Sequence, residues 1–125
     1  MLRPLLLSLL LLSSGASCGA RQATTGARTD RDIITVDQIQ ERGFRNAYEA
    51  VEGLRATWLK ERPDGLATQR EIQVYLDNSR LGGVTMLRQI STAQIASIRY
   101  IDAATAINRW GVDHSQGVIM VISRR

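Results

Sequence analysis

The sequence contains few of the residues that cross-link a chain or bind metals. Among its 125 residues are one cysteine, one histidine and two prolines. A single cysteine excludes a disulfide within the chain. One histidine, without an acidic cluster of the calcium-loop type, provides too few ligands for a metal centre. We therefore expect no cofactor, and the length is enough for one domain that folds around its own core.

Long apolar runs are also missing, except at the N-terminus. Arg3 gives the first residues a positive charge, residues 5–12 are apolar apart from Ser8, and small residues follow as far as Ala20. This order is typical of a secretory signal peptide. The apolar run is much shorter than the roughly 20 residues of a membrane-spanning helix. We predict that residues 1–20 direct export; a short retained anchor is the alternative.

The one cysteine, Cys18, follows the apolar part of this signal. The sequence Gly15-Ala16-Ser17-Cys18 resembles the lipobox of bacterial lipoproteins, although that family usually has leucine where Gly15 stands. The resemblance implies that Cys18 is acylated, as by palmitate, and becomes the mature N-terminus. Acyl chains would then hold the protein at the outer membrane, facing the periplasm. Ordinary cleavage near Ala20, which releases a soluble periplasmic protein, is the alternative.

Charge is spread evenly along the rest of the chain. The formal net charge of all 125 residues is +4, and basic and acidic residues are interleaved without a block of either sign. An exported protein does not meet the chromosome, so we expect no nucleic-acid partner. A solvated surface is favoured over weak attraction to anionic lipid headgroups. Residues 21–32 contain no apolar side chain larger than alanine, which predicts a flexible linker.

Residues 33–125 show the periodicity of one small α/β (α+β) domain in two layers. We predict about four short strands in a mixed sheet and two to four short helices. The strands are expected at residues 33–34, 71–77, 98–102 and 118–122. Helical segments are expected at residues 36–42, 47–60, 84–90, 93–96 and 103–110. Asp77-Asn78 predicts a turn, and residues 78–83 are expected to form a loop.

The segment 47–60 is the clearest helix of the sequence. Its apolar residues recur at helical spacing and are expected in the core: Ala47, Tyr48, Val51, Leu54, Trp58 and Leu59. Gly53 lies inside this helix, where glycine costs about 1 kcal/mol relative to alanine. We therefore expect a close neighbour at Gly53.

Catalytic residue types occur together at one place, between Gly111 and Gly117. Asp113-His114-Ser115 has the residue types of a hydrolytic triad, followed by Gln116. Consecutive side chains do not converge, however, and a triad also needs an oxyanion hole. No G-x-S-x-G sequence is present in the predicted domain at residues 33–125. We interpret the segment as a polar loop of a protein that is not an enzyme.

Several short motifs, in order, resemble the plug domain of TonB-dependent outer-membrane receptors. Residues 46–50 fit an early plug helix, residues 74–78 a strand and turn, and residues 95–100 a second strand. Trp110-Gly111 resembles the aromatic-glycine pair of plug domains, and residues 117–121 resemble their last strand. The motif positions are Asp77, Asn78, Trp110, Gly111, Gly117 and Val118. Asp32 to Val36 is a candidate for the segment that engages TonB.

The sequence also departs from the plug pattern. Asn78 replaces a glycine, residues 103–105 lack an Arg-Gly-Pro, and residues 113–116 replace a loop richer in glycine. A receptor continues into a barrel of about 22 strands, whereas this sequence ends at Arg125. We therefore expect a stand-alone plug-like domain. The resemblance implies the fold, the envelope location and a role in contacts, but not transport.

These observations predict a non-enzymatic envelope lipoprotein. It would bind the membrane through the lipid on Cys18. Its loops at residues 78–83 and 112–116 would contact an outer-membrane barrel, another envelope protein or a small ligand. The contact residues expected in the second loop are Asp113, His114, Ser115 and Gln116. Alternatives are a small periplasmic hydrolase that uses Asp113, His114 or Ser115, a soluble ligand-binding protein, and a structural spacer.

Overall fold

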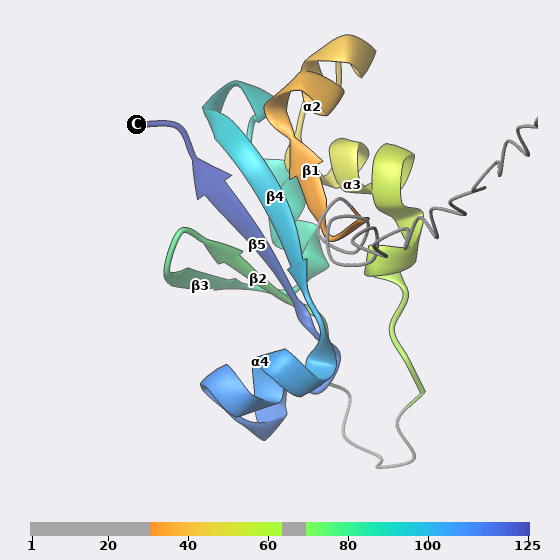
Figure 1. Ribbon diagram of the computed structural model, residues 1–125, viewed down its shortest axis with the longest axis vertical. Coiled ribbons are helices and arrows are strands. Elements are labelled where there is room, and N and C mark those ends of the chain that lie inside the picture. Colours follow the sequence, from red (N-terminus) through yellow and green to blue (C-terminus); the bar gives the residue numbers. More distant parts are fainter. Residues whose placement is uncertain (1–30, 64–69) are drawn as a thin grey trace, which may run out of the picture.

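A five-stranded mixed sheet forms the centre of the molecule (Figure 1). The computed structural model describes residues 31–63 and 70–125. The strand order is β1-β4-β5-β2-β3, in which β2 and β5 run parallel and the other neighbours run antiparallel. The strands are β1 (Ile33–Thr35), β2 (Gln73–Leu76), β3 (Ser79–Gly82), β4 (Ile95–Ile101) and β5 (Val118–Ser123). The prediction of a small α/β domain with a mixed sheet is confirmed.

Short helical segments connect the strands. In residues 31–63 and 70–125, three are α-helices: α2 (Val36–Arg42), α3 (Ala47–Arg55) and α4 (Ala103–Trp110). Four are 3-10 turns: η1 (Ala56–Leu59), η2 (Val84–Gln89), η3 (Thr92–Gln94) and η4 (Val112–His114). The expected helix at residues 47–60 thus divides into α3 and η1. The expected helical turn at residues 93–96 ends early, because β4 begins at Ile95.

Local capping sets where the helices begin and end. The Thr35 hydroxyl and the Gln38 side chain form a capping box at the start of α2, and Gly43 ends that helix in the left-handed conformation at φ 66°. The Asn46 side chain accepts from the Glu49 N–H at 3.0 Å at the start of α3. Side chains of these types satisfy backbone N–H groups that a helix start leaves without partners. The predicted starts at Thr35 and Asn46 are therefore confirmed.

The prediction of a loop at residues 78–83 is wrong, because the chain forms strand β3 there. Asp77 adopts a positive φ of 54°, and the two-residue turn Asp77-Asn78 brings Ser79 opposite Leu76. A tight turn of this kind joins antiparallel strands directly. Leu81 then packs against the core. The glycines at 82 and 83 pointed to a loop, but the turn had already been made at Asp77.

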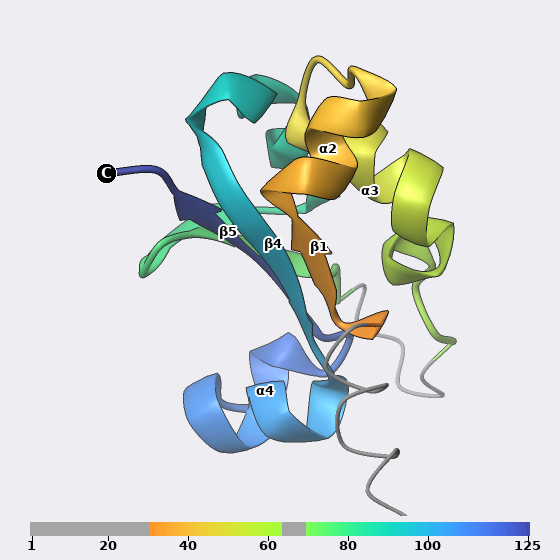
Figure 2. The ribbon, with the colours of Figure 1, turned by 45° about the horizontal axis from the view of Figure 1, so that its top comes forward.

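The main core lies between the sheet and the layer that contains α2 and α3 (Figure 2). Strand residues Ile34, Val74, Ile98, Ile119 and Val121 are fully buried there. From the helical layer come Ile39, Ala47, Ala50, Val51, Trp58 and Leu87. The apolar stripe predicted for residues 47–59 therefore packs against the sheet.

Gly53 has the close neighbour that the sequence predicts. A Cβ atom at this position would stand 2.7 Å from the end of the Phe44 ring. Alanine would therefore displace the ring, and glycine lets α3 approach the chain that leads out of α2.

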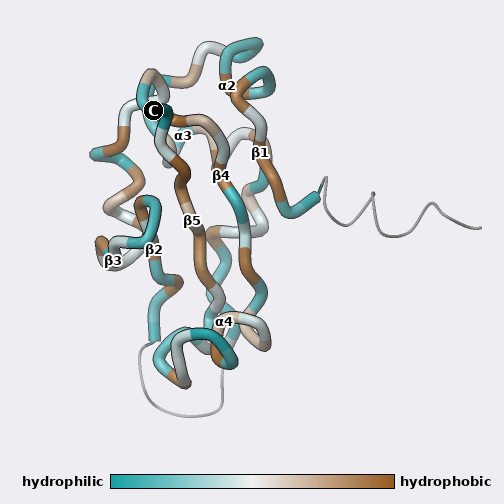
Figure 3. Tube along the Cα trace, turned by 60° about the vertical axis from the view of Figure 1, so that its left-hand side comes forward, coloured by the Kyte–Doolittle hydropathy of each residue, from teal (hydrophilic) through white to brown (hydrophobic). Residues whose placement is uncertain are grey.

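Among the described residues, the second face of the sheet is covered only at one end. A small cluster of Tyr75, Ala106 and Val118 packs there, with Ile101, Trp110 and Met120 around it. Figure 3 looks towards this face: α4 lies across one end of the strands, and β4 and β5 continue beyond it.

Three sequence predictions fall outside the described residues: the signal peptide at 1–20, the modified Cys18, and the linker as far as residue 30. In the part of the chain that the structure describes, no helix combines the length and apolar character needed to cross a bilayer.

Candidate binding site beside strand β1

The polar segment between Gly111 and Gly117 does not face solvent as expected. His114 and Gln116 are buried, with 3% and 4% of their surfaces exposed. Asp113 is exposed and Ser115 is half-buried. The interpretation of Asp113 to Gln116 as one exposed contact loop is therefore wrong for two of its four residues. The physical reason is the 3-10 turn η4, which folds the segment back on itself and turns His114 inward.

His114 lies in an aromatic pocket. Its Nε2 is 2.9 Å from the Tyr75 hydroxyl. Its ring centroid is 5.9 Å from that of Tyr75 and 5.6 Å from that of Trp110, and Tyr75 and Trp110 stack at 5.0 Å. The buried Nδ1 has no hydrogen-bond partner within residues 31–63 and 70–125. The imidazole therefore meets a tyrosine and a tryptophan, rather than a carboxylate and a serine as in a triad.

Gln116 joins two parts of the chain that lie far apart in sequence. Its amide oxygen accepts from the Arg62 N–H at 2.7 Å, and its amide nitrogen donates to the Arg62 carbonyl at 2.7 Å. Both polar groups of the side chain are thus satisfied by one backbone unit. Gln116 therefore fixes the segment that follows η1.

The plug-motif residues occupy turns and ends of the central strands. Gly117 has a φ of 93°, and a Cβ atom there would stand 2.8 Å from the Tyr100 hydroxyl and 2.9 Å from the Ile101 carbonyl oxygen. Gly111 ends α4 with a φ of 98°. Trp110 is the partner of the Tyr75 stack, Val118 is fully buried, and Asn78 is exposed in the turn.

Asp77 ties the β2–β3 hairpin to β5. Its carboxylate accepts from the Ser123 N–H at 3.0 Å and from the Ser123 hydroxyl at 2.7 Å. These two bonds hold the pKa of Asp77 below its usual value, with a smaller contribution from Arg125. The motif residues thus have structural contacts in this protein.

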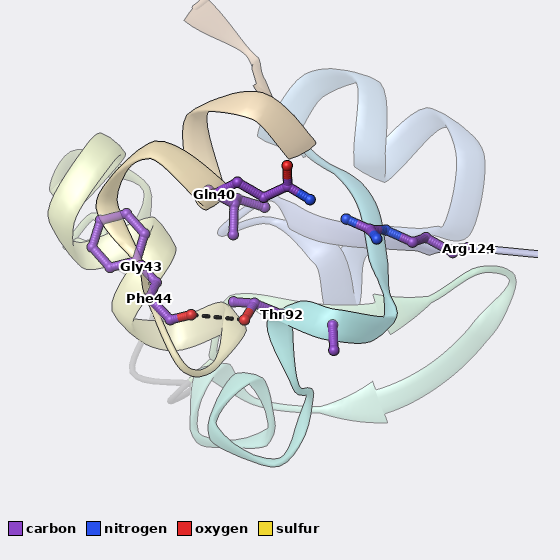
Figure 4. A pocket seen from close by; sticks show the side chains of 7 residues that line it. Gln40, Gly43, Phe44, Thr92 and Arg124 are labelled. Atoms are coloured by element: carbon purple, nitrogen blue, oxygen red, sulfur yellow. Dashed lines mark hydrogen bonds between the residues drawn. The ribbon is translucent and has the colours of Figure 1, made fainter.

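Three surface depressions have nearly equal volumes, of about 410, 400 and 410 Å³. The first lies at the end of α2 (Figure 4), between Gln40, Phe44, Thr92 and Arg124. The Thr92 hydroxyl donates to the Phe44 carbonyl at 2.7 Å, and the Arg124 Nε donates to the Ile95 carbonyl at 2.9 Å. The Thr92 hydroxyl and the Arg124 Nε therefore already have partners within the protein. The three depressions therefore differ in the residues that line them and not in volume.

The other two depressions are basic and lie side by side. Both include Asp32 and Tyr100 in their lining. Arg99 and Arg109 line the depression on the second face of the sheet, which we call the sheet-face depression. The depression beside η1, which we call the η1 cavity, is lined by the basic residues Arg31, Arg55, Lys60 and Arg62. Six basic residues thus line two depressions that share one acidic residue, Asp32.

Sequence reasoning missed these six residues. The alternation in β4 could have identified Arg99, because it lies between the inward-facing Ile98 and Tyr100. No periodicity links Arg31, Arg55 and residues 60–62, since tertiary folding brings them together. Within the residues that the structure describes, no group of three or more His, Cys, Asp or Glu side chains could hold a metal ion.

The geometry supports binding of an acidic or anionic partner. Basic side chains attract carboxylates and phosphates through charge-assisted hydrogen bonds. The chain matches no protein-family model, no curated protein and no solved structure.

Proposed function

We propose that this chain is a non-enzymatic, plug-like domain of the bacterial cell envelope that acts by contact with another envelope protein. A lipid on Cys18 would hold it at the outer membrane, facing the periplasm. The observation that carries the proposal is the uncovered part of the sheet's second face, which includes the sheet-face depression.

This part of the sheet combines apolar strand residues with basic ones. Ile33, Met120 and Ile122 are half-buried and line the sheet-face depression together with the exposed Arg99. Apolar side chains edged by arginine are typical of protein–protein contact surfaces. On the opposite face of the sheet, the comparable side chains are covered by α2 and α3. The proposal therefore places the partner on the face that residues 31–63 and 70–125 leave partly uncovered.

Site-specific photocrosslinking in intact bacteria tests this contact. A photoreactive residue replaces Arg99 in the full chain, and the matched control carries it at Glu52, which is exposed on α3. We expect an envelope protein to be crosslinked from position 99 and not from position 52. The same products from both positions, or none from position 99, would contradict the proposal.

Labelling with palmitate tests the lipid anchor separately. The wild-type chain should incorporate the label, and Cys18→Ser should not. Equal labelling of the two chains, or none, removes the anchor from the proposal but leaves the crosslinking result intact.

A further inference from the structure

The η1 cavity concentrates positive charge more than any stretch of the sequence does. Arg31, Arg55, Lys60 and Arg62 line it, and among the described residues Asp32 is the one acidic residue in the lining. Elsewhere the two signs are interleaved. Glu61 stands between Lys60 and Arg62 in sequence but is not among the lining residues. Folding thus separates the two signs at this place.

Two of the four basic residues are fixed by backbone contacts. The Arg55 guanidinium donates to the Arg31 carbonyl at 3.1 Å and to the Leu54 carbonyl at 2.9 Å. The backbone of Arg62 is held by the side chain of Gln116 at 2.7 Å on both of its polar groups. A binding site of this kind loses less conformational entropy when a ligand arrives.

An aromatic pair forms one wall of the cavity. Trp58 and Tyr100 stack with a centroid separation of 5.6 Å, and Trp58 is 6% exposed. Burial raises the pKa of the Tyr100 hydroxyl, although Arg62 works in the opposite direction. The hydroxyl therefore stays protonated at neutral pH and remains a hydrogen-bond donor.

Three of the four basic side chains, including that of Arg62, can still contact a ligand. In the described part of the chain, the side chains of Arg31, Lys60 and Arg62 form no hydrogen bond or ion pair within the protein. All three are exposed. Arginine offers a planar fork of donors and lysine a compact charge, and both bind phosphate oxygens.

We propose that the η1 cavity binds a phosphate group, with Arg31, Lys60 and Arg62 contacting its oxygens and Arg55 acting as a positioning residue. The phosphate could belong to a lipid headgroup or to a soluble phosphate compound, since the charges and donors required are the same. Phosphate binding here goes beyond the proposed function, because it gives a ligand class to a cavity separate from the crosslinking position.

Titration of the full chain with defined phosphates tests the assignment. The probes are inorganic phosphate, dihexanoyl phosphatidic acid as a soluble lipid headgroup, and dihexanoyl phosphatidylcholine as a net-neutral control. Amide shifts around Arg31 and the Trp58 indole signal report occupancy by NMR. We expect saturable shifts with one or both anionic probes, and weaker binding at higher salt.

Charge-matched variants separate a site from general attraction. Lys60→Gln with Arg62→Gln should weaken binding by about 30-fold, if each basic residue contributes as near an anionic lipid surface. Arg42→Gln with Arg45→Gln removes the same charge outside the cavity and should have little effect. Equal losses in the two double variants, or no saturable shift with either anionic probe, would overturn the assignment.

The two probes also identify the source of the phosphate. Binding of phosphatidic acid alone indicates a lipid headgroup, and binding of inorganic phosphate indicates a soluble compound. A chain that crosslinks through position 99 but binds neither phosphate loses this assignment and keeps the proposed function. A chain that binds phosphate but forms no crosslink keeps the phosphate assignment and loses the proposed function.

Discussion

Two adjacent segments of this protein carry polar side chains and use them in opposite ways. The segment between Gly111 and Gly117 buries His114 and Gln116. The segment at residues 55–62 presents Arg55, Lys60 and Arg62 to a surface cavity. The two meet where Gln116 binds the backbone of Arg62. A histidine beside a serine and an aspartate thus serves packing, while an interleaved charged stretch forms the candidate site.

The difference shows that the role of a polar side chain depends more on its orientation in the fold than on its residue type. Segment 111–117 is bounded by two glycines with positive φ and contains the turn η4. That backbone directs His114 against Tyr75 and Trp110. Arg55 is the last residue of α3, and the turn η1 that follows buries Trp58 while Lys60 and Arg62 beyond it are exposed. The predictions below test the contrast, starting with the largest expected effect.

Gly117→Ala should be the most destabilising of these changes. Its Cβ atom would stand 2.8 Å from the Tyr100 hydroxyl and 2.9 Å from the Ile101 carbonyl oxygen, at a φ of 93°. Backbone strain and overpacking together should lower the free energy of unfolding by about 3 kcal/mol or more. Urea denaturation measures the loss.

Gly111→Ala is the matched control for Gly117. Its φ is 98°, but in the described part of the chain no atom beyond its two sequence neighbours lies within 4 Å of the added Cβ. Only the strain remains, at about 1–2 kcal/mol. Equal losses at the two glycines would show that the close approach of Tyr100 does not matter.

The His114–Tyr75 pair should behave as a structural hydrogen bond. Tyr75→Phe leaves Nε2 without its recorded partner, beside an Nδ1 that already has none in the described residues. Leaving a buried polar group unpaired costs about 1–3 kcal/mol, whereas replacing both partners by apolar groups can be nearly neutral. The double variant Tyr75→Phe with His114→Phe should therefore recover much of the stability lost in Tyr75→Phe. A double variant that loses the sum of both single effects contradicts this interpretation.

The sequence predicted the architecture better than the site. Capping residues and periodicity are local, so the starts of α2 and α3 and the strands around Val74, Ile98 and Ile119 were within reach. Strand β3 was missed because the glycines at 82 and 83 favoured a loop, although the turn at Asp77-Asn78 that precedes the strand was predicted. The η1 cavity was missed because Arg31 and Arg62 meet only through the folded chain.

Gln116→Leu should affect both segments at once. It removes two bonds of 2.7 Å to the Arg62 backbone, whose polar groups lie near the surface where water can replace the amide. The loss of unfolding free energy should be about 1–2 kcal/mol. Lys60→Gln, an exposed change in the neighbouring segment, should stay within about 0.5 kcal/mol of the wild type. Thermal denaturation of both variants checks the contrast, and equal effects would remove the distinction between the segments.

Gln116→Leu should also weaken phosphate binding, because it frees the chain that carries Arg62. Lys60→Gln should weaken binding without a loss of stability. The phosphate titration of the two variants separates a positioning role from a contacting one. A Gln116→Leu protein with unchanged binding would show that Arg62 needs no such support.

The smallest effect concerns Asp77, an exposed residue with a structural contact. Bonds from the Ser123 N–H and hydroxyl lower its pKa in the folded protein. A lowered folded pKa adds stability above the unfolded value, near 3.9 for aspartate, and that contribution disappears as the pH falls through the folded value. Stability should therefore decrease from about pH 5 downward.

Asp77→Asn should reduce this decrease, and Ser123→Ala, which keeps the N–H donor, should reduce it less. Urea denaturation between neutral and acidic pH measures the three curves. Identical slopes for all three proteins would mean that the Asp77–Ser123 contact contributes nothing to stability in solution. The exposed contact of Asp77 would then lack the stabilising effect that is expected of the buried residues His114 and Gln116.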